Sequence, residues 1–151
     1  MKKMIALALA ALMSAVLFAG CSNGGSSDDW KDGTYRASYK NAHYGWTEYL
    51  EVTVKDGKIT EADFDGLNEE GTRKSEDEAY EQSMKDGGSD VGPMEFYAMY
   101  EQKLLDKQNA KDVDAVATAT SSGDSLKELF AALEKNMAKG DTKEVIVDNA
   151  E

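Results

Sequence analysis

The chain has 151 residues, of which 29 are acidic and 17 basic, so its formal net charge at pH 7 is −12. A surface this acidic repels the phosphate backbone of nucleic acids and disfavours binding to them. One cysteine, Cys21, and one histidine, His43, are too few for a disulfide framework or for the usual zinc, copper and iron–sulfur ligand sets.

The first 20 residues have the pattern of a secretory signal peptide. A basic start, MKK, precedes an apolar run that ends at Phe18 and is too short to cross a membrane as a helix. The dipeptide Ala-Gly comes directly before Cys21, and this ending resembles the lipobox of lipoproteins, whose cysteine thiol takes a diacylglyceryl group. We therefore predict a signal peptide over residues 1–20 and a lipid anchor at Cys21. The alternative is a soluble secreted protein with one free thiol.

The segment after the predicted anchor has the composition of a flexible tether. Residues 21–29 contain SNGGSSDD, which is rich in Gly, Ser and Asp. Two acyl chains are enough for stable anchoring in a membrane. The folded domain, predicted over residues 30–148, is thus expected at the extracytoplasmic face of the cell membrane. Loss of the two signal-peptide lysines would bring the net charge of the mature chain to −14.

Alternating apolar residues predict the strands. WKDGTYRASY, residues 30–39, alternates as a first strand, and the loop NAHYGW follows it. In YLEVTVKDGKITEADF, two alternating runs are joined by Asp56-Gly57, a pair that tolerates positive φ at both positions and predicts a β-hairpin. A last short strand is predicted over residues 144–147.

Helical spacing and capping signals predict three helices. We expect the first to begin at a capping box formed by Ser75 and Glu78, and the second to begin at Pro93. The apolar residues of the second helix share one face: Phe96, Tyr97, Tyr100 and Leu104.

The third helix, SLKELFAALEKNM, has the clearest helical spacing. We expect it to begin behind Asp124, at a capping box of Ser125 and Glu128, and to end at Gly140. The order strand, hairpin, three helices, strand predicts an α+β fold. In it, a small antiparallel sheet with a β-hairpin packs against about three helices.

A run of hydroxyl side chains stands directly before this third predicted helix. VDAVATATSS contains Thr118, Thr120, Ser121 and Ser122. A helix N-terminus needs only one capping oxygen, which Asp124 or Ser125 can supply. The run is therefore either a Ser/Thr-rich loop or a place where an oxygen is offered for chemistry.

This stretch resembles the flavinylation motif of FMN-binding domains, which reads Asp, two residues, Ser or Thr, Gly, Ala, then an acceptor Thr or Ser. Asp114 matches the first position, Ala119 the alanine and Thr120 the acceptor. The resemblance extends over about residues 30–147, through DGTYRASY, GWTEYLEVTVKDGKITEADFD, SEDEAYEQSM, YEQKLLDKQNAKDVDAV and GDTKEVIV. Such domains are similar to the C subunit of sodium-pumping quinone reductases and to anchored flavoproteins of extracellular electron transfer.

In that family a flavin transferase uses FAD to attach FMN to the threonine through a phosphodiester. The resemblance implies a membrane-anchored electron carrier rather than an enzyme, with a membrane quinone or NADH dehydrogenase as electron donor. It places FMN on Thr120, with these residues around it: Asp114, Thr118, Ala119, Ser121 and Ser122. The phosphate would lie near a helix N-terminus, which favours anions. The candidate walls for the flavin ring are Trp46, Tyr49 and Tyr100.

Two positions depart from the motif. Ala117 stands at the Ser/Thr position and Thr118 at the glycine, where glycine would permit a sharp bend and close approach. Threonine is β-branched and tolerates positive φ poorly. Three alternatives stay open: covalent FMN, noncovalent flavin, and a flavin-free surface binding lipoprotein that keeps the fold. The acidic runs 61–70 and 76–81 are interpreted as solvated surface, so no metal site is predicted.

Overall fold

The computed structural model describes residues 29–149. The predicted signal peptide, the anchor residue Cys21 and all of the predicted tether except Asp29 lie outside the described residues. Within the described part, no helix is long and apolar enough to cross a membrane.

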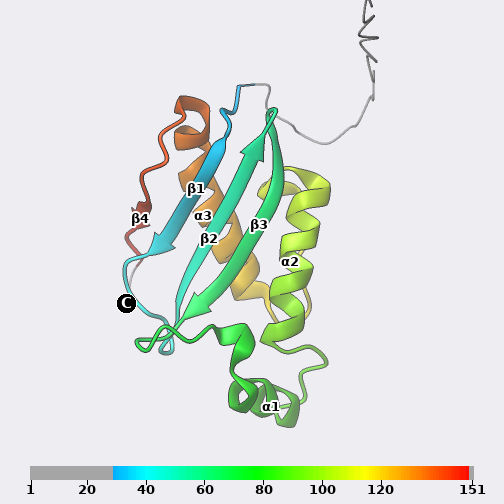
Figure 1. The fold of residues 1–151 in the computed structure, drawn as a ribbon. Helices are drawn as coiled ribbons and strands as arrows, with labels where there is room; N and C mark the ends of the chain where they lie inside the picture. Colours follow the sequence, from blue (N-terminus) through cyan, green and yellow to red (C-terminus); the bar gives the residue numbers. More distant parts are fainter. Residues whose placement is uncertain (1–28, 150–151) are drawn as a thin grey trace, which may run out of the picture.

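Four strands form one sheet in the order β3-β2-β1-β4 (Figure 1). Their bounds are β1 Gly33–Tyr39, β2 Thr47–Lys55, β3 Lys58–Leu67 and β4 Val145–Val147. Strands β1, β2 and β3 pair antiparallel, whereas β4 runs parallel to β1. The sheet is therefore mixed at one edge rather than wholly antiparallel as predicted. Between β1 and β4 the chain passes through β2, β3 and the three helices, and a crossover connection of this length permits parallel pairing.

The predicted hairpin is confirmed as β2 and β3. Asp56 and Gly57 connect the two strands with φ values of 51° and 72°. These two positive values match the two-residue turn that Asp-Gly predicts. Leu50, Val52 and Phe64 then fall on the buried face of the hairpin.

Three helices complete the α+β fold: α1 Glu78–Asp86, α2 Pro93–Lys107 and α3 Thr120–Lys139. Two short 3₁₀ helices, η1 Lys74–Glu76 and η2 Ala110–Asp112, lie between them. Helices α2 and α3 cover one face of the sheet, and α1 lies at the end where β3 finishes (Figure 1). The largest fully buried side chains come from the sheet and from these two helices: Tyr35, Leu50, Val52, Phe64, Tyr97, Tyr100, Leu104, Leu126, Leu129, Phe130, Leu133 and Met137.

The predicted capping boxes are both wrong. Helix α1 is capped by Asp77, whose carboxylate accepts from the Tyr80 N–H at 2.8 Å, while Ser75 lies in η1 and donates its hydroxyl to Asp65. Helix α3 begins at Thr120, so Ser125 lies inside it. The predicted start at Pro93 and end at Gly140 are confirmed, with Gly140 at φ 74°.

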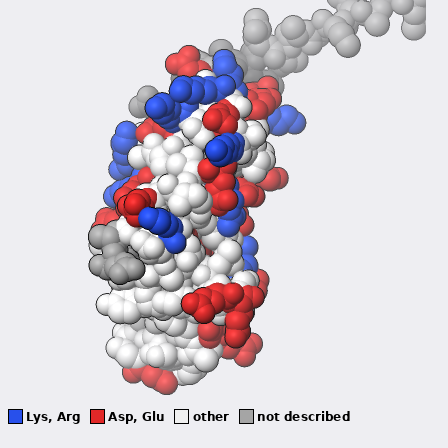
Figure 2. All heavy atoms as spheres, turned by 90° about the vertical axis from the view of Figure 1, so that its left-hand side faces the viewer, with Lys and Arg blue, Asp and Glu red and all other residues white. Residues whose placement is uncertain are grey.

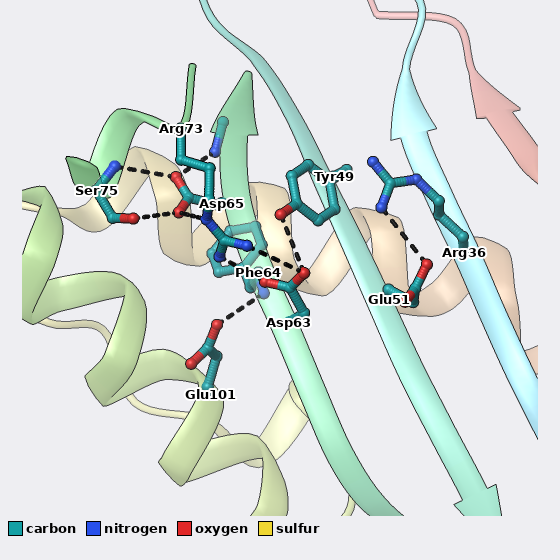
Figure 3. Close-up of polar contacts among 10 residues, drawn as sticks. Arg36, Tyr49, Glu51, Asp63, Phe64, Asp65, Arg73, Ser75 and Glu101 are labelled. Carbon is teal, nitrogen blue, oxygen red and sulfur yellow. Dashed lines mark hydrogen bonds and ion pairs between the residues drawn. The ribbon is translucent and has the colours of Figure 1, made fainter. Parts of the chain in front are cut away.

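Side chains of α2 and of its C-cap residue Gln108 hydrogen-bond to the outer edge of β3. The Gln108 side chain accepts from the Ile59 N–H at 2.7 Å and donates to the Ile59 carbonyl at 2.9 Å. The Glu101 carboxylate accepts from the Phe64 N–H at 2.9 Å (Figure 3). These contacts fix α2 against the sheet edge.

Candidate functional site

A pocket of about 420 Å³ lies at the end of the molecule where β2 begins and α3 starts. Its lining combines aromatic and polar side chains: Tyr39, His43, Tyr44, Trp46, Glu48, Lys74, Tyr80, Ser121, Ser122, Asp124, Ser125 and Asn149. Figure 2 shows that the surface at this end, seen from the β4 side, is largely uncharged, with acidic side chains along one edge and at the base. Charged side chains crowd the opposite end in the same view.

One side of the pocket is aromatic and carries a single lysine. The rings of Trp46 and Tyr80 meet edge to face with their centroids 6.0 Å apart. The Lys74 ammonium lies 4.7 Å from the centroid of the Tyr80 ring. This side therefore offers flat apolar surface next to one positive charge.

The other side of the pocket is hydrogen-bonded and acidic. The Glu48 carboxylate accepts from the Ser122 hydroxyl at 2.7 Å and from the Tyr97 hydroxyl at 2.8 Å. Burial, together with the Glu48 charge, raises the pKa of Tyr97, so this hydroxyl stays protonated and keeps donating. Ser122 is thus engaged in the protein's own hydrogen bonds and is only 5% exposed.

The N-terminus of α3 has no internal cap. Its N-cap residue is Ala119, which makes no side-chain capping hydrogen bond, and the first turn contains no acidic residue. The first amide groups of a helix carry partial positive charge and point along the axis. This end of α3 can therefore accept an anion.

A tight turn immediately before α3 fixes where the helix begins. The Ala119 N–H donates to the Val116 carbonyl at 3.1 Å, and Thr118 between them has φ 67°. The buried Tyr100 hydroxyl accepts from the Val116 N–H at 2.9 Å and donates to the Ala119 carbonyl at 2.8 Å. The turn is therefore held at both ends by one side chain of α2, and this contact explains why α3 begins earlier than the capping pattern predicts.

The predicted site residues lie together except for Asp114. Thr118, Ala119, Thr120, Ser121 and Ser122 are consecutive through the turn and the first turn of α3, whereas Asp114 is exposed in the loop before it. Thr120 is exposed but does not line the pocket; Ser121 and Ser122 do.

Only one of the three predicted wall aromatics lines the pocket. Trp46 does, while Tyr100 lies in the core. Tyr49 lies on the sheet face away from α2 and α3, under the Arg36 guanidinium at 3.8 Å and hydrogen-bonded to Asp63 at 3.1 Å (Figure 3). The prediction that Tyr49 and Tyr100 face the cofactor is therefore not supported by their positions.

Most of the aromatic lining of the pocket was not predicted from the sequence. Tyr39, His43, Tyr44 and Tyr80 come from β1, from the loop after it and from α1. One local signal for an aromatic side chain at a turn was the Tyr-Gly pair in NAHYGW. This pair resembles the Asp-Gly turn signal, but its first residue is aromatic.

Comparison with known proteins identifies a relative of nearly full length. No family model matches the chain. The 15 kDa lipoprotein of Treponema pallidum (strain Nichols) is 34% identical over 142 residues, which cover 93% of this chain and 94% of that protein.

A solved structure has the same fold. The crystal structure of the CPE2226 protein from Clostridium perfringens matches with a TM-score of 0.75 and 36% identity, covering 80% of this chain and 99% of that one. Neither name mentions a flavin, so FMN remains a prediction, whereas the lipoprotein prediction is supported. The chain belongs to the family of the 15 kDa lipoprotein of Treponema pallidum.

Proposed function

We propose that this protein is a membrane-anchored, extracytoplasmic electron-transfer flavoprotein that carries FMN joined to Thr120 through a phosphodiester. The proposal starts from the resemblance of residues 114–120 to the flavinylation motif. One structural observation carries it further: Thr118, at the motif's glycine position, has φ 67°. Glycine is favoured at such a backbone position, so the turn has the shape that the motif's glycine accommodates.

The position of Thr120 suits modification by a separate enzyme. It is exposed and is the first residue of α3, so a flavin transferase can reach its hydroxyl. The Thr120 oxygen would form a bond to the FMN-side phosphorus of FAD, and the bond between the two phosphates would break. AMP leaves with the bonding electrons, and the hydroxyl proton passes to a base of the transferase. The remaining phosphodiester carries one negative charge beside the uncapped α3 N-terminus.

The pocket provides a place for the ring. It borders Thr120 through Ser121 and Ser122, and its aromatic side offers the flat apolar walls that a flavin ring needs. Its volume of about 420 Å³ is typical of small-molecule sites. The carboxylates of Glu48 and Asp124 line the pocket and repel a phosphate. The flavin ring is therefore favoured inside the pocket and the phosphate outside it. When bound, FMN supplies one- and two-electron transfer.

The lipid anchor gives the carrier its place in the electron path. A chain tethered at Cys21 stays within reach of a membrane quinone or NADH dehydrogenase, the class of donor that the resemblance implies. A covalent bond prevents the cofactor from diffusing away outside the cell. The protein is thus an electron carrier rather than an enzyme with a substrate of its own.

Intact mass tests this proposal. The full chain is expressed with a flavin transferase, and the wild type should gain the mass of FMN less one water. Thr120→Ala should not gain it, while the matched variant Ser121→Ala should. Equal masses for the wild type and Thr120→Ala would falsify the attachment at Thr120.

A flavin-free surface binding lipoprotein is the second candidate. It is favoured by Ala117 and Thr118, which differ from the motif next to the proposed acceptor. A colourless protein, purified from cells that visibly modify another FMN-binding domain, would support this candidate instead.

A further inference from the structure

The loop between β1 and β2 repeats the turn of the β2–β3 hairpin. His43 and Trp46 exchange two backbone hydrogen bonds, of 2.8 Å and 3.1 Å. Between them, Tyr44 and Gly45 have φ values of 50° and 82°. These values nearly repeat those at Asp56 and Gly57 in the hairpin. Both turns therefore need positive φ at two successive residues.

Tyr44 does not suit the position that it occupies. The first residue of such a turn is usually Asn, Asp or Gly, as it is at Asp56. A tyrosine there is strained, and its side chain is 84% exposed, so packing in the core does not offset the strain. Its ring contacts the adjacent His43 ring, with centroids 4.3 Å apart. Strained residues of this kind cluster at ligand sites.

Tyr44 also lies where a ligand would meet it. It lines the pocket together with Trp46 and Tyr80, and the first turn of α3 lines the same pocket. Trp46 is 6% exposed and packs edge to face against Tyr80, whereas Tyr44 is 84% exposed. The pocket thus has one buried aromatic wall and one exposed aromatic side chain at its rim.

We infer that Tyr44 is a positioning residue whose ring covers the flavin ring in this pocket. The inference rests on the proposed function, because the occupant is the FMN attached at Thr120. In the flavin-free protein, the exposed Tyr44 ring does not offset the strain of the Tyr44 backbone. Burial of this ring against the flat flavin ring would offset that strain. The contact of Tyr44 with the ligand therefore explains why a residue that is unfavourable in this turn occupies it.

Substitution of Tyr44 by asparagine separates strain from contact. Tyr44→Asn should raise the unfolding midpoint of the unmodified protein by roughly 4 °C, because asparagine tolerates positive φ. The same substitution should leave the covalent mass gain unchanged and make the flavin more fluorescent and more readily quenched by iodide. Its Kd for free FMN, measured on the unmodified protein, should rise about five- to tenfold. Tyr44→Phe should behave as the wild type.

Asp56→Tyr is the matched control, since it places a tyrosine in the twin turn away from the pocket. It should lower the unfolding midpoint and leave flavin fluorescence and FMN affinity unchanged. If Tyr44→Asn retains wild-type fluorescence, quenching and FMN affinity, the inference is wrong while covalent attachment stands. A wild type without covalent flavin whose affinity for free FMN still depends on Tyr44 would support the inference and overturn the attachment at Thr120. A wild type that neither gains the mass nor binds free FMN overturns both.

Discussion

The Tyr100 hydroxyl donates a 2.8 Å hydrogen bond to the carbonyl of Ala119, the residue directly before α3. The same oxygen accepts from the Val116 N–H, so one buried side chain holds both ends of the turn that precedes Thr120. A side chain of α2 thereby determines where α3 begins and where the proposed acceptor lies.

We expect Tyr100→Phe to lower the free energy of unfolding by about 2 kcal/mol, because it leaves the buried Val116 N–H without a partner. The Ala119 carbonyl keeps its bond from the Gly123 N–H at 3.1 Å. Urea denaturation gives the stability, and hydrogen exchange at the Val116 amide reports the local effect. The exposed Tyr44→Phe is the control. Unchanged exchange at Val116 would show that Tyr100 does not hold the turn.

Gly123→Ala should also destabilise the protein, although alanine is the better helix former by about 1 kcal/mol. A Cβ at this position would lie 2.5 Å from the Tyr100 hydroxyl. Either α3 or Tyr100 must then shift, which typically costs about 1–3 kcal/mol. Urea denaturation checks the sign, with the exposed Ser121→Ala as the reference substitution in the same helix turn. A Gly123→Ala protein more stable than the wild type contradicts the close packing.

Thr118→Gly should stabilise the protein and raise the yield of covalent flavin. A β-branched residue at φ 67° costs about 1–2 kcal/mol, more than glycine loses through unfolded-state entropy. The substitution also removes the 2.8 Å contact between the Thr118 and Ser89 hydroxyls, so we expect a net gain of about 0.5 kcal/mol. Thr118→Ala should be less stable than Thr118→Gly. The reverse order would show that the turn prefers a side chain.

Asp65→Asn should lower the free energy of unfolding by about 2 kcal/mol, because the Asp65 carboxylate is fully buried and its charge-assisted hydrogen bonds would be weakened or lost, although its partner Arg73 is one-third exposed. The Asp65 carboxylate accepts from Arg73 at 2.9 Å, from the Gly66 N–H at 2.7 Å and from both the N–H and the hydroxyl of Ser75 (Figure 3). Asp63→Asn is the control, since the Asp63 side chain pairs with the same arginine but is 40% exposed. Equal losses of unfolding free energy for the two variants would mean that burial of the carboxylate does not determine the size of the loss.

Glu101→Gln should change the pH dependence of stability. Burial raises the pKa of Glu101 in the folded state above its usual 4.5, so the folded state favours the protonated carboxyl group. The stability of the wild type therefore falls as pH rises from about 4.5 to this raised pKa. Glutamine carries no charge and can still accept from the Phe64 N–H. The variant should therefore gain stability relative to the wild type at pH 7 and lose that gain below about pH 4.5. Urea denaturation from pH 4 to 7 measures the difference, and a constant difference would contradict the raised pKa.

The strands could be predicted because their signals are local. Alternation in β1 and β2 and the Asp56-Gly57 pair depend only on neighbouring residues, and all three were confirmed. The start of α2 at Pro93 is also a local signal and was confirmed. The starts of α1 and α3 could not be predicted, because tertiary contacts decide them: Asp65 binds Ser75, and Tyr100 holds the turn before Thr120. Ser75 and Ser125 were predicted as caps, but Ser75 lies in η1 and donates to Asp65, and Ser125 lies inside α3.

For the same reason, the sequence predicts only those parts of the candidate site that depend on neighbouring residues. The hydroxyl run was located from the sequence, and its turn has positive φ where the motif has glycine. Most of the aromatic wall could not be located from the sequence, because Tyr39, Tyr44 and Tyr80 meet only after the chain folds. The position of Tyr49 could have been predicted: it alternates with buried Leu50, so it must face away from the helices.

The contacts of Glu101 and Gln108 with β3 have a consequence for how copies of this protein meet. Unpaired strand edges template the growth of sheets between molecules, and neighbours confined to a two-dimensional layer collide often. Here Ile59 and Phe64 already have partners from the C-cap of α2 and from α2 itself, and the opposite edge strand, β4, is only three residues long. Crowding at a lipid surface would therefore offer few openings for intermolecular strand exchange.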